Sequence, residues 1–214
     1  MPLLVIALVL AQAAPPAGPA AEPAPAPVPT GPVVTLDVFQ GRTALGTITI
    51  ALNQEKAPVS VRNFLSYVRS GHYDGTVFHR VMGSFMIQGG GYTPELEEKP
   101  TQAPIRNEAR NGLRNARGAV AMARLNPPDS ATSQFFINLK DNHMLDFGIS
   151  GAGYAVFGQV IEGMDVVDRI AAVPTTSRGQ HQSVPQVAVV IRKAREVNAA
   201  APVAAPKPAV PPKP

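Results

Sequence analysis

The sequence predicts a mainly β protein, folded as a closed antiparallel barrel and not as a doubly wound sheet. Three features of the chain predict this fold. Short stretches of alternating apolar and polar residues recur, glycine-rich turns separate them, and only two segments have helical periodicity. Since 45% of the 214 residues are hydrophobic, the chain can also bury one ordinary core.

A hairpin and a helix are expected first. Residues 34–38 and 47–52 alternate with period two on either side of a glycine-containing loop, as hairpin strands do. Pro58 suits the first turn of a helix, and Gly71 suits the residue after its end. The apolar face of this helix has the spacing i, i+3, i+4 and i+7 and consists of Val61, Phe64, Leu65 and Val68.

Short strands dominate the rest of the chain, after a turn at Asp74-Gly75. The expected strands are Thr76–Val81, Phe85–Gln88, Ala119–Ala123, Gln134–Leu139 and Ala155–Val160. A second helix is expected at about Met164–Ala171, before a last strand at Val187–Arg192.

The distribution of proline along the chain indicates the expected domain boundaries. Of the 23 prolines, eight lie between Ala14 and Pro32 and six between Ala199 and Pro214. These stretches have almost no large apolar side chains, so they cannot offset the entropy of ordering. We expect linkers at 14–32 and 198–214, with the folded domain at 33–197.

The first thirteen residues have the pattern of a signal peptide. An apolar run from Leu3 to Leu10 precedes Ala11-Gln12-Ala13, a cleavage site of the A-x-A type. The run is shorter than the roughly 20 residues that span a bilayer, so no stable membrane insertion is expected. No Lys or Arg precedes the run, which leaves two alternatives open: an ordinary apolar start, or a true start further upstream.

Several function classes are disfavoured by composition and motifs. The net charge is +4, but the arginines are scattered and form no concentrated patch for nucleic acid. The chain has no cysteine, and its four histidines lack the spacing of a helical zinc site. The nearest approach to a nucleophile elbow, 148–152, lacks the final glycine and a preceding strand. An enzyme built from this chain would need no metal, cofactor or nucleophile.

Three predicted strands carry polar residues among apolar ones. Period two places Thr76, Phe78, Arg80 and Met82 on one face. It also places Met86 with Gln88, opposite Phe85, and Gln134 with Phe136. The result is a face with one cation, two amides and large apolar groups. Such a face suits an extended peptide, with a pocket for one side chain and donors for backbone carbonyls.

Four motifs in order and spacing make the chain similar to a known family. "FHRVMGSFMIQGG", "GAVAMAR", "SQFFINL" and "YAVFGQV" resemble the cyclophilin-type peptidyl-prolyl cis-trans isomerases, and most closely their periplasmic bacterial branch. The resemblance covers residues 33–195 and implies an eight-stranded antiparallel barrel capped by two helices. It also implies a cofactor-independent isomerase whose active site lies on the outer barrel wall.

The resemblance implies a role for each matched residue. Arg80 is the expected catalytic residue, and Gln88 is expected to contact the peptide backbone beside it. The backbone of Ala123 and Arg124 is expected to pair with the residues before the proline, with Gln134 alongside. His79 is expected to have a packing role. The proline pocket is expected to consist of Phe85, Met86, Phe136 and Leu145.

The chain departs from the family pattern at three places. Met82-Gly83-Ser84 replaces an apolar-Pro-Gly link. Met144 stands where eukaryotic members have tryptophan, and Tyr154 where they have histidine. Met82, Met144 and Tyr154 are nevertheless expected to border the substrate site.

Three function hypotheses follow. The chain is a secreted, monomeric prolyl isomerase acting on proline-containing unfolded or extended polypeptides in the periplasm, where it assists envelope-protein folding. Alternatively, it is a module that holds such peptides without turning them over, or a scaffold whose Pro/Ala-rich tails make contacts. Arg80 together with Phe85, Gln88 and Phe136 favours the enzyme.

Overall fold

The computed structural model describes residues 31–197. The expected signal peptide, almost all of the first linker and the C-terminal tail therefore lie outside the described residues. The helices are α1 (Pro58–Arg69) and α2 (Met164–Ala171), with short 3-10 turns η1 (Ala109–Asn111) and η2 (His143–Leu145). The strands are β1 (Val33–Gln40), β2 (Thr43–Leu52), β3 (Arg80–Met82), β4 (Met86–Gly89), β5 (Ala119–Met122), β6 (Phe135–Asn138), β7 (Val156–Glu162), β8 (Thr175–Arg178), β9 (His181–Pro185) and β10 (Val189–Val197).

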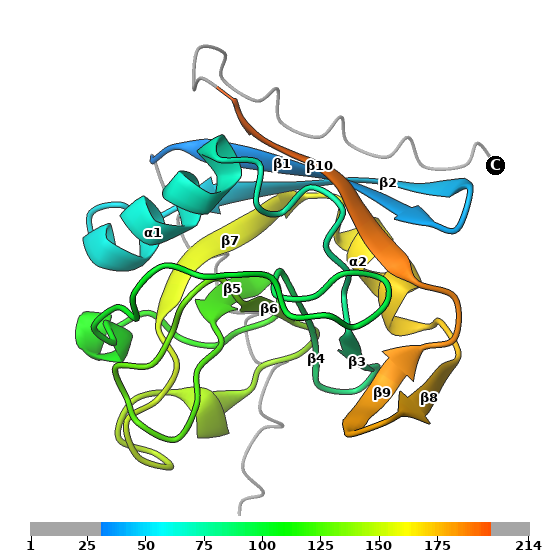
Figure 1. The fold of residues 1–214 in the computed structure, drawn as a ribbon. Helices are drawn as coiled ribbons and strands as arrows, with labels where there is room; N and C mark the ends of the chain where they lie inside the picture. Colours follow the sequence, from blue (N-terminus) through cyan, green and yellow to red (C-terminus); the bar gives the residue numbers. More distant parts are fainter. Residues whose placement is uncertain (1–30, 198–214) are drawn as a thin grey trace, which may run out of the picture.

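Eight of the strands form one curled antiparallel sheet (Figure 1). Their order is β10-β1-β2-β7-β5-β6-β4-β3, and β8 pairs with β9 as a separate hairpin. The sheet closes only partly, because its edge strands β3 and β10 share no ladder of their own. The chain just before β3 joins them instead, through an isolated bridge between Val77 and Val190 and a bond from Ile191 N–H to Thr76 O (2.8 Å).

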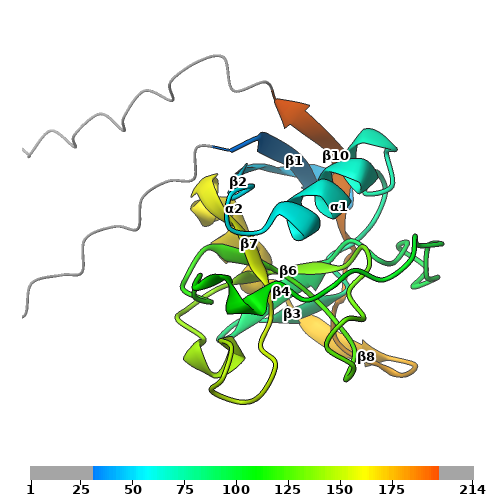
Figure 2. The ribbon, with the colours of Figure 1, turned by 90° about the vertical axis from the view of Figure 1, so that its left-hand side faces the viewer.

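The core fills the inside of this sheet. Alternate residues of β1, such as Leu36, are fully buried, as a period of two requires, whereas the second half of β2, 48–52, is buried on both faces. Phe64 of α1 lies in contact with the rings of Tyr73, Phe135 and Phe157, at centroid distances of 5.1, 5.4 and 5.1 Å. α1 and α2 lie on separate sides of the molecule in both views (Figures 1 and 2). The two helices therefore cap the core that the sheet surrounds.

The N-terminus of α1 is capped by the carboxylate of a residue that is distant in the chain. Its N-cap, Ala57, has no side chain that can satisfy the free N–H groups of the first turn. Glu108 accepts hydrogen bonds from the N–H groups of Val59 (3.0 Å) and Ser60 (2.7 Å), and from the Ser60 hydroxyl (2.7 Å). The negative charge also complements the positive end of the helix dipole. Glu108 thus ties α1 to the segment before β5.

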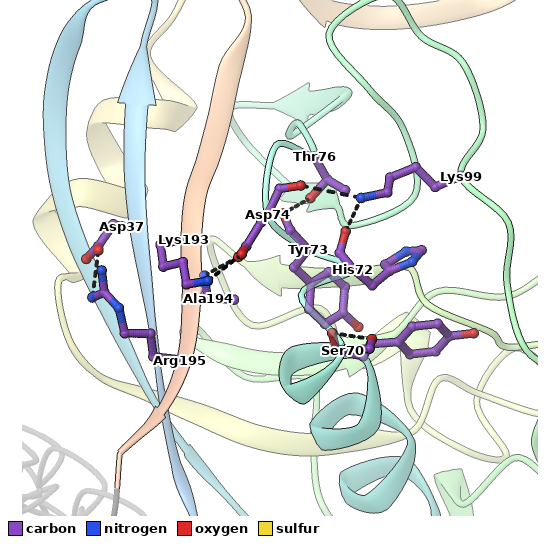
Figure 3. Close-up of polar contacts among 11 residues, drawn as sticks. Asp37, Ser70, His72, Tyr73, Asp74, Thr76, Lys99, Lys193, Ala194 and Arg195 are labelled. Atoms are coloured by element: carbon purple, nitrogen blue, oxygen red, sulfur yellow. Dashed lines mark hydrogen bonds and ion pairs between the residues drawn. The ribbon is translucent and has the colours of Figure 1, made fainter.

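A second polar network fixes the loop that leads from α1 to the site (Figure 3). Asp74 accepts bonds from Lys193 Nζ (2.7 Å) and Ala194 N–H (2.9 Å) on β10. Burial would raise the pKa of Asp74, but these bonds outweigh burial and lower it below its usual value. Lys99 Nζ donates to the carbonyl oxygens of His72 and Asp74. The start of the segment that carries Arg80 is therefore anchored on both sides.

The sequence-based elements agree with this fold except in two places. The expected strand Thr76–Val81 is wrong for most of its length, because only Arg80–Met82 pairs with β4. The preceding residues leave that plane and bond to β10 instead. The hairpin β8–β9 was not expected, because its first strand is polar and fully exposed. No helix within 31–197 is long and apolar enough to cross a membrane.

Candidate active site

Strand register creates the site. Arg80 on β3 pairs with Gln88 on β4, Gln88 pairs with Phe136 on β6, and Phe136 pairs with Ala121 on β5. Directly paired residues point to the same face of a sheet, so these side chains form one row across four strands. The next row, Val81, Ile87, Ile137 and Val120, is buried in the core. The first row therefore faces outward.

A small apolar pocket of about 180 Å³ lies at this outward row. It is much smaller than the roughly 300–1,000 Å³ of pockets for drug-sized ligands, so it fits a single small ring. Met86 and Phe136 are almost fully buried and belong to an apolar cluster separate from the main core. The pocket is lined by Arg80, Phe85, Met86, Gln88, Ala123, Arg124, Phe136, Leu145 and Tyr154.

Tyr154 and Arg124 build one wall of the pocket. The Tyr154 ring meets the Phe136 ring edge to face, with centroids 5.6 Å apart. The Arg124 guanidinium lies 4.6 Å from the centre of the Tyr154 ring and donates to the carbonyls of Gly153 (3.0 Å) and Leu125 (2.8 Å). These contacts fix the wall, because a guanidinium with several oxygen partners and a stacked ring has little freedom.

A larger groove of about 580 Å³, most of whose lining residues are polar, adjoins the pocket. The two hollows share Arg80, Gln88, Ala123 and Arg124, so an extended chain can occupy both. Gln88 Nε2 donates to Gln134 Oε1 at 2.9 Å, which orients both amides along the groove. Arg80 is exposed and makes no ion pair with any residue in 31–197. Its guanidinium is therefore free to meet a ligand.

His79 lies beneath the groove, beside Arg80. Its side chain is buried and packs edge to face on Tyr92, with ring centroids 4.6 Å apart. Burial, assisted by repulsion from His181 and Arg80, lowers the pKa of His79 to about 4. The imidazole is therefore neutral at ordinary pH, which agrees with the expected packing role.

The structure brings together most of the expected site residues. Nine line the small pocket, and Gln134 lines the adjoining groove. Met82 packs beside the pocket cluster without lining the pocket, and Met144 on η2 is 65% exposed and lines neither hollow. The N–H of Ala123 already donates to Gln134 O at 3.0 Å, so that donor serves the protein's own fold.

Two of the expected side-chain faces are wrong. Phe78 and Thr76 are buried and do not share the exposed face of Arg80, since residues 76–79 are not a regular strand. Phe85 joins Met86 in the same cluster because it lies in the turn before β4, with its N–H bonded to Met82 O (2.8 Å). Period two applies only within a strand, and all three residues lie outside one.

Sequence reasoning missed the groove's outer wall. Gln180, His181 and Gln182 come from the β8–β9 hairpin, and Tyr92 and Glu98 come from the loop after β4. The sequence offers only a weak signal for the hairpin: Gly179 marks a turn, but the run before it, 175–178, is polar throughout.

Comparison with known proteins identifies the family. A family model described as "Cyclophilin type peptidyl-prolyl cis-trans isomerase/CLD" matches residues 38–196. The chain belongs to this family. The resemblance carried by the four sequence motifs is therefore confirmed, and so is the enzyme class: this cyclophilin is a peptidyl-prolyl cis-trans isomerase.

Bacterial relatives of this cyclophilin share more than half of the aligned residues. It is 56% identical over 161 residues to a peptidyl-prolyl cis-trans isomerase of Acinetobacter baylyi, covering 74% of this chain and 86% of the relative. It is 53% identical over 149 residues to peptidyl-prolyl cis-trans isomerase B of Escherichia coli, covering 68% and 91%. A crystal structure of a Cryptosporidium parvum cyclophilin has a TM-score of 0.65 at 24% identity, covering 78% and 97%. That likeness supports the fold.

Proposed function

We propose that this cyclophilin rotates Xaa-Pro bonds in the cleft formed by the pocket and the groove, with Arg80 as its catalytic residue. One observation carries the assignment: a free, exposed guanidinium stands at the rim of an apolar pocket the size of one ring. Proline-containing chains are the proposed substrates. A C. parvum cyclophilin crystallised in the presence of the dipeptide Ala-Pro supports this substrate class.

The proposed chemistry needs only positioned donors. Amide resonance gives the peptide bond a rotational barrier of about 18–20 kcal/mol, and resonance is lost when the bond twists. In the twisted state the proline nitrogen becomes pyramidal and its lone pair can accept a hydrogen bond. A guanidinium aimed at that nitrogen stabilises the twisted state more than either planar state, and this difference is what accelerates the reaction.

The remaining residues hold the substrate in place. The proline ring enters the apolar pocket between Phe136, Met86 and Leu145, which removes its surface from water. Gln88, oriented by Gln134, donates to the peptide backbone beside Arg80. Because the Ala123 N–H is engaged, the Ala123 carbonyl and the Arg124 backbone are left to pair with the residues before the proline. The pocket thus fixes one side of the rotating bond while the groove fixes the other.

A binding module that holds proline peptides without turning them over is the alternative. An acetylated Ala-Ala-Pro-Phe peptide separates the two, with cis-trans exchange followed by NMR. We expect catalytic amounts of protein to accelerate exchange, which takes tens to hundreds of seconds without a catalyst. Binding of the peptide with an unchanged exchange rate would contradict the proposal and favour the module.

We further propose that the protein acts outside the cytoplasm, in the periplasm, on exported and envelope proteins. The apolar run Leu3–Leu10 with its A-x-A site supports export, and the similarity to bacterial isomerases agrees with it. The mature chain should then begin near Ala14. N-terminal sequencing of protein from the envelope fraction tests this, and an intact Met1–Ala13 on cytoplasmic protein would contradict it.

A further inference from the structure

The β8–β9 hairpin contributes Gln180, His181 and Gln182 to the groove next to the proposed catalytic arginine, and His181 is the ionisable one of the three. β8 is exposed along its whole length, while Val184 and Pro185 of β9 are buried and anchor the hairpin, which packs against β3. A two-residue turn with Gly179 at φ 58° joins the strands. The first residue after the turn is His181. Its ring lies 5.0 Å from the ring of Tyr92 and 6.4 Å from that of His79.

The groove beside this hairpin is basic, and most of the residues that line it are polar. Arg80 and Arg124 both line it, and neither is paired with a carboxylate from the part of the chain that the structure describes. The carbonyls that hold Arg124 are neutral, so its charge stays uncompensated. Among residues 31–197, Glu98 is the single acidic residue in the lining, and it is exposed. A ligand side chain in this groove therefore meets a net positive field.

Ser183, two residues after His181, has a φ of 57°, a conformation that is uncommon for residues other than glycine. This backbone conformation lies in the strand that presents His181.

We propose that the groove is a subsite for an acidic side chain of the substrate, on the amino-terminal side of its proline, and that His181 is a specificity-determining residue there. The imidazole donates an N–H to the carboxylate while Arg80 and Arg124 supply the favourable field. Glu98 opposes the field and limits the preference. The proposal rests on the proposed function, since the pocket must hold the proline for the groove to receive the preceding residues.

Two series of acetylated, amide-ended peptides test the proposal, Xaa-Ala-Pro-Phe and Ala-Xaa-Pro-Phe, with Glu, Gln or Lys as Xaa. Protease-free NMR exchange gives kcat/KM for each peptide with the full protein. In one of the series we expect the Glu peptide to exceed the Lys peptide by about three- to tenfold at low salt. The ratio should shrink at about 1 M salt, where the Debye length is about 3 Å.

Variants separate recognition from packing. His181→Phe keeps an aromatic ring against Tyr92 but removes the N–H donor, so the Glu-to-Lys ratio should fall towards one while the thermal midpoint is kept. Glu98→Gln should raise the ratio. Gln186→Ala, exposed just after β9 and outside the groove lining, is the matched control and should leave the ratio unchanged.

The outcomes distinguish this proposal from the proposed function. Normal catalysis with a ratio near one in both series, or an unchanged ratio in a folded His181→Phe protein, would overturn the subsite and leave the isomerase assignment intact. Absence of catalysis for every peptide would overturn the proposed function itself.

Discussion

The Arg80→Ala protein should lose about 10²–10³-fold in kcat/KM, which corresponds to roughly 3–4 kcal/mol of transition-state stabilisation. Arg80 is exposed on the outward row of the sheet and makes no ion pair with residues 31–197, so its removal opens no core cavity. The thermal midpoint should therefore stay within a few degrees of the wild-type value, as expected for a change of under about 0.5 kcal/mol.

Arg80→Lys is the matched variant for this prediction. An ammonium keeps the charge but lacks the planar fork that can donate to the nitrogen and a neighbouring carbonyl together, so little activity should return. Arg114→Ala is the control, since Arg114 is also an exposed arginine but lies outside both hollows. A folded Arg80→Ala protein with near-normal turnover would remove Arg80 from the mechanism.

The Phe136→Ala protein should lose both stability and substrate binding. Phe136 is 4% exposed, and truncating a buried phenylalanine costs about 3–5 kcal/mol in the free energy of unfolding. We expect the lower end of this range, because Phe136 belongs to the outer cluster and not to the main core. The Tyr154 ring also loses its edge-to-face contact, so the wall held by Arg124 loosens.

In the Phe136→Ala protein the loss of activity should appear mainly as a raised KM. The proline ring loses the apolar surface that holds it in both the planar and the twisted states. Urea unfolding combined with turnover measures the two losses separately. Phe136→Leu should restore most of both, and Phe147→Ala, which removes a 41%-exposed ring outside the small pocket, should change neither KM nor kcat. An unchanged KM in a folded Phe136→Ala protein would contradict a proline pocket at this position.

Much of the fold was predictable because its signals are local. The period of two in β1 and β2, and the helical spacing of Val61, Phe64 and Leu65, are properties of adjacent residues. The alternation in "SQFFINL" also placed Phe136 outward and Phe135 inward, as the structure has them. The row of Arg80, Gln88 and Phe136 could not be predicted from local patterns, because strand register joins residues that are far apart in the chain. Family motifs supplied that information.

The parts that sequence did not predict depend on tertiary contacts. Residues 76–79 look like a strand, yet their partners on β10 lie more than a hundred residues away. The carboxylate that satisfies the start of α1 comes from Glu108, 48 residues beyond Ser60. The β8–β9 hairpin has few apolar residues in its first strand, so its strand pattern is weak. Such placements follow from the assembled sheet, not from local preference.

In the proposed mechanism Arg80 stabilises the twisted amide and not the bound planar peptide. NMR measures both quantities on one sample of the Arg80→Ala protein: Kd for an acetylated Ala-Ala-Pro-Phe peptide by titration, and the cis-trans exchange rate of the bound peptide. We expect a Kd within about threefold of wild type and an exchange rate lower by about 10²–10³-fold. A Kd weakened in proportion to kcat/KM, with bound exchange as fast as in wild type, would contradict it.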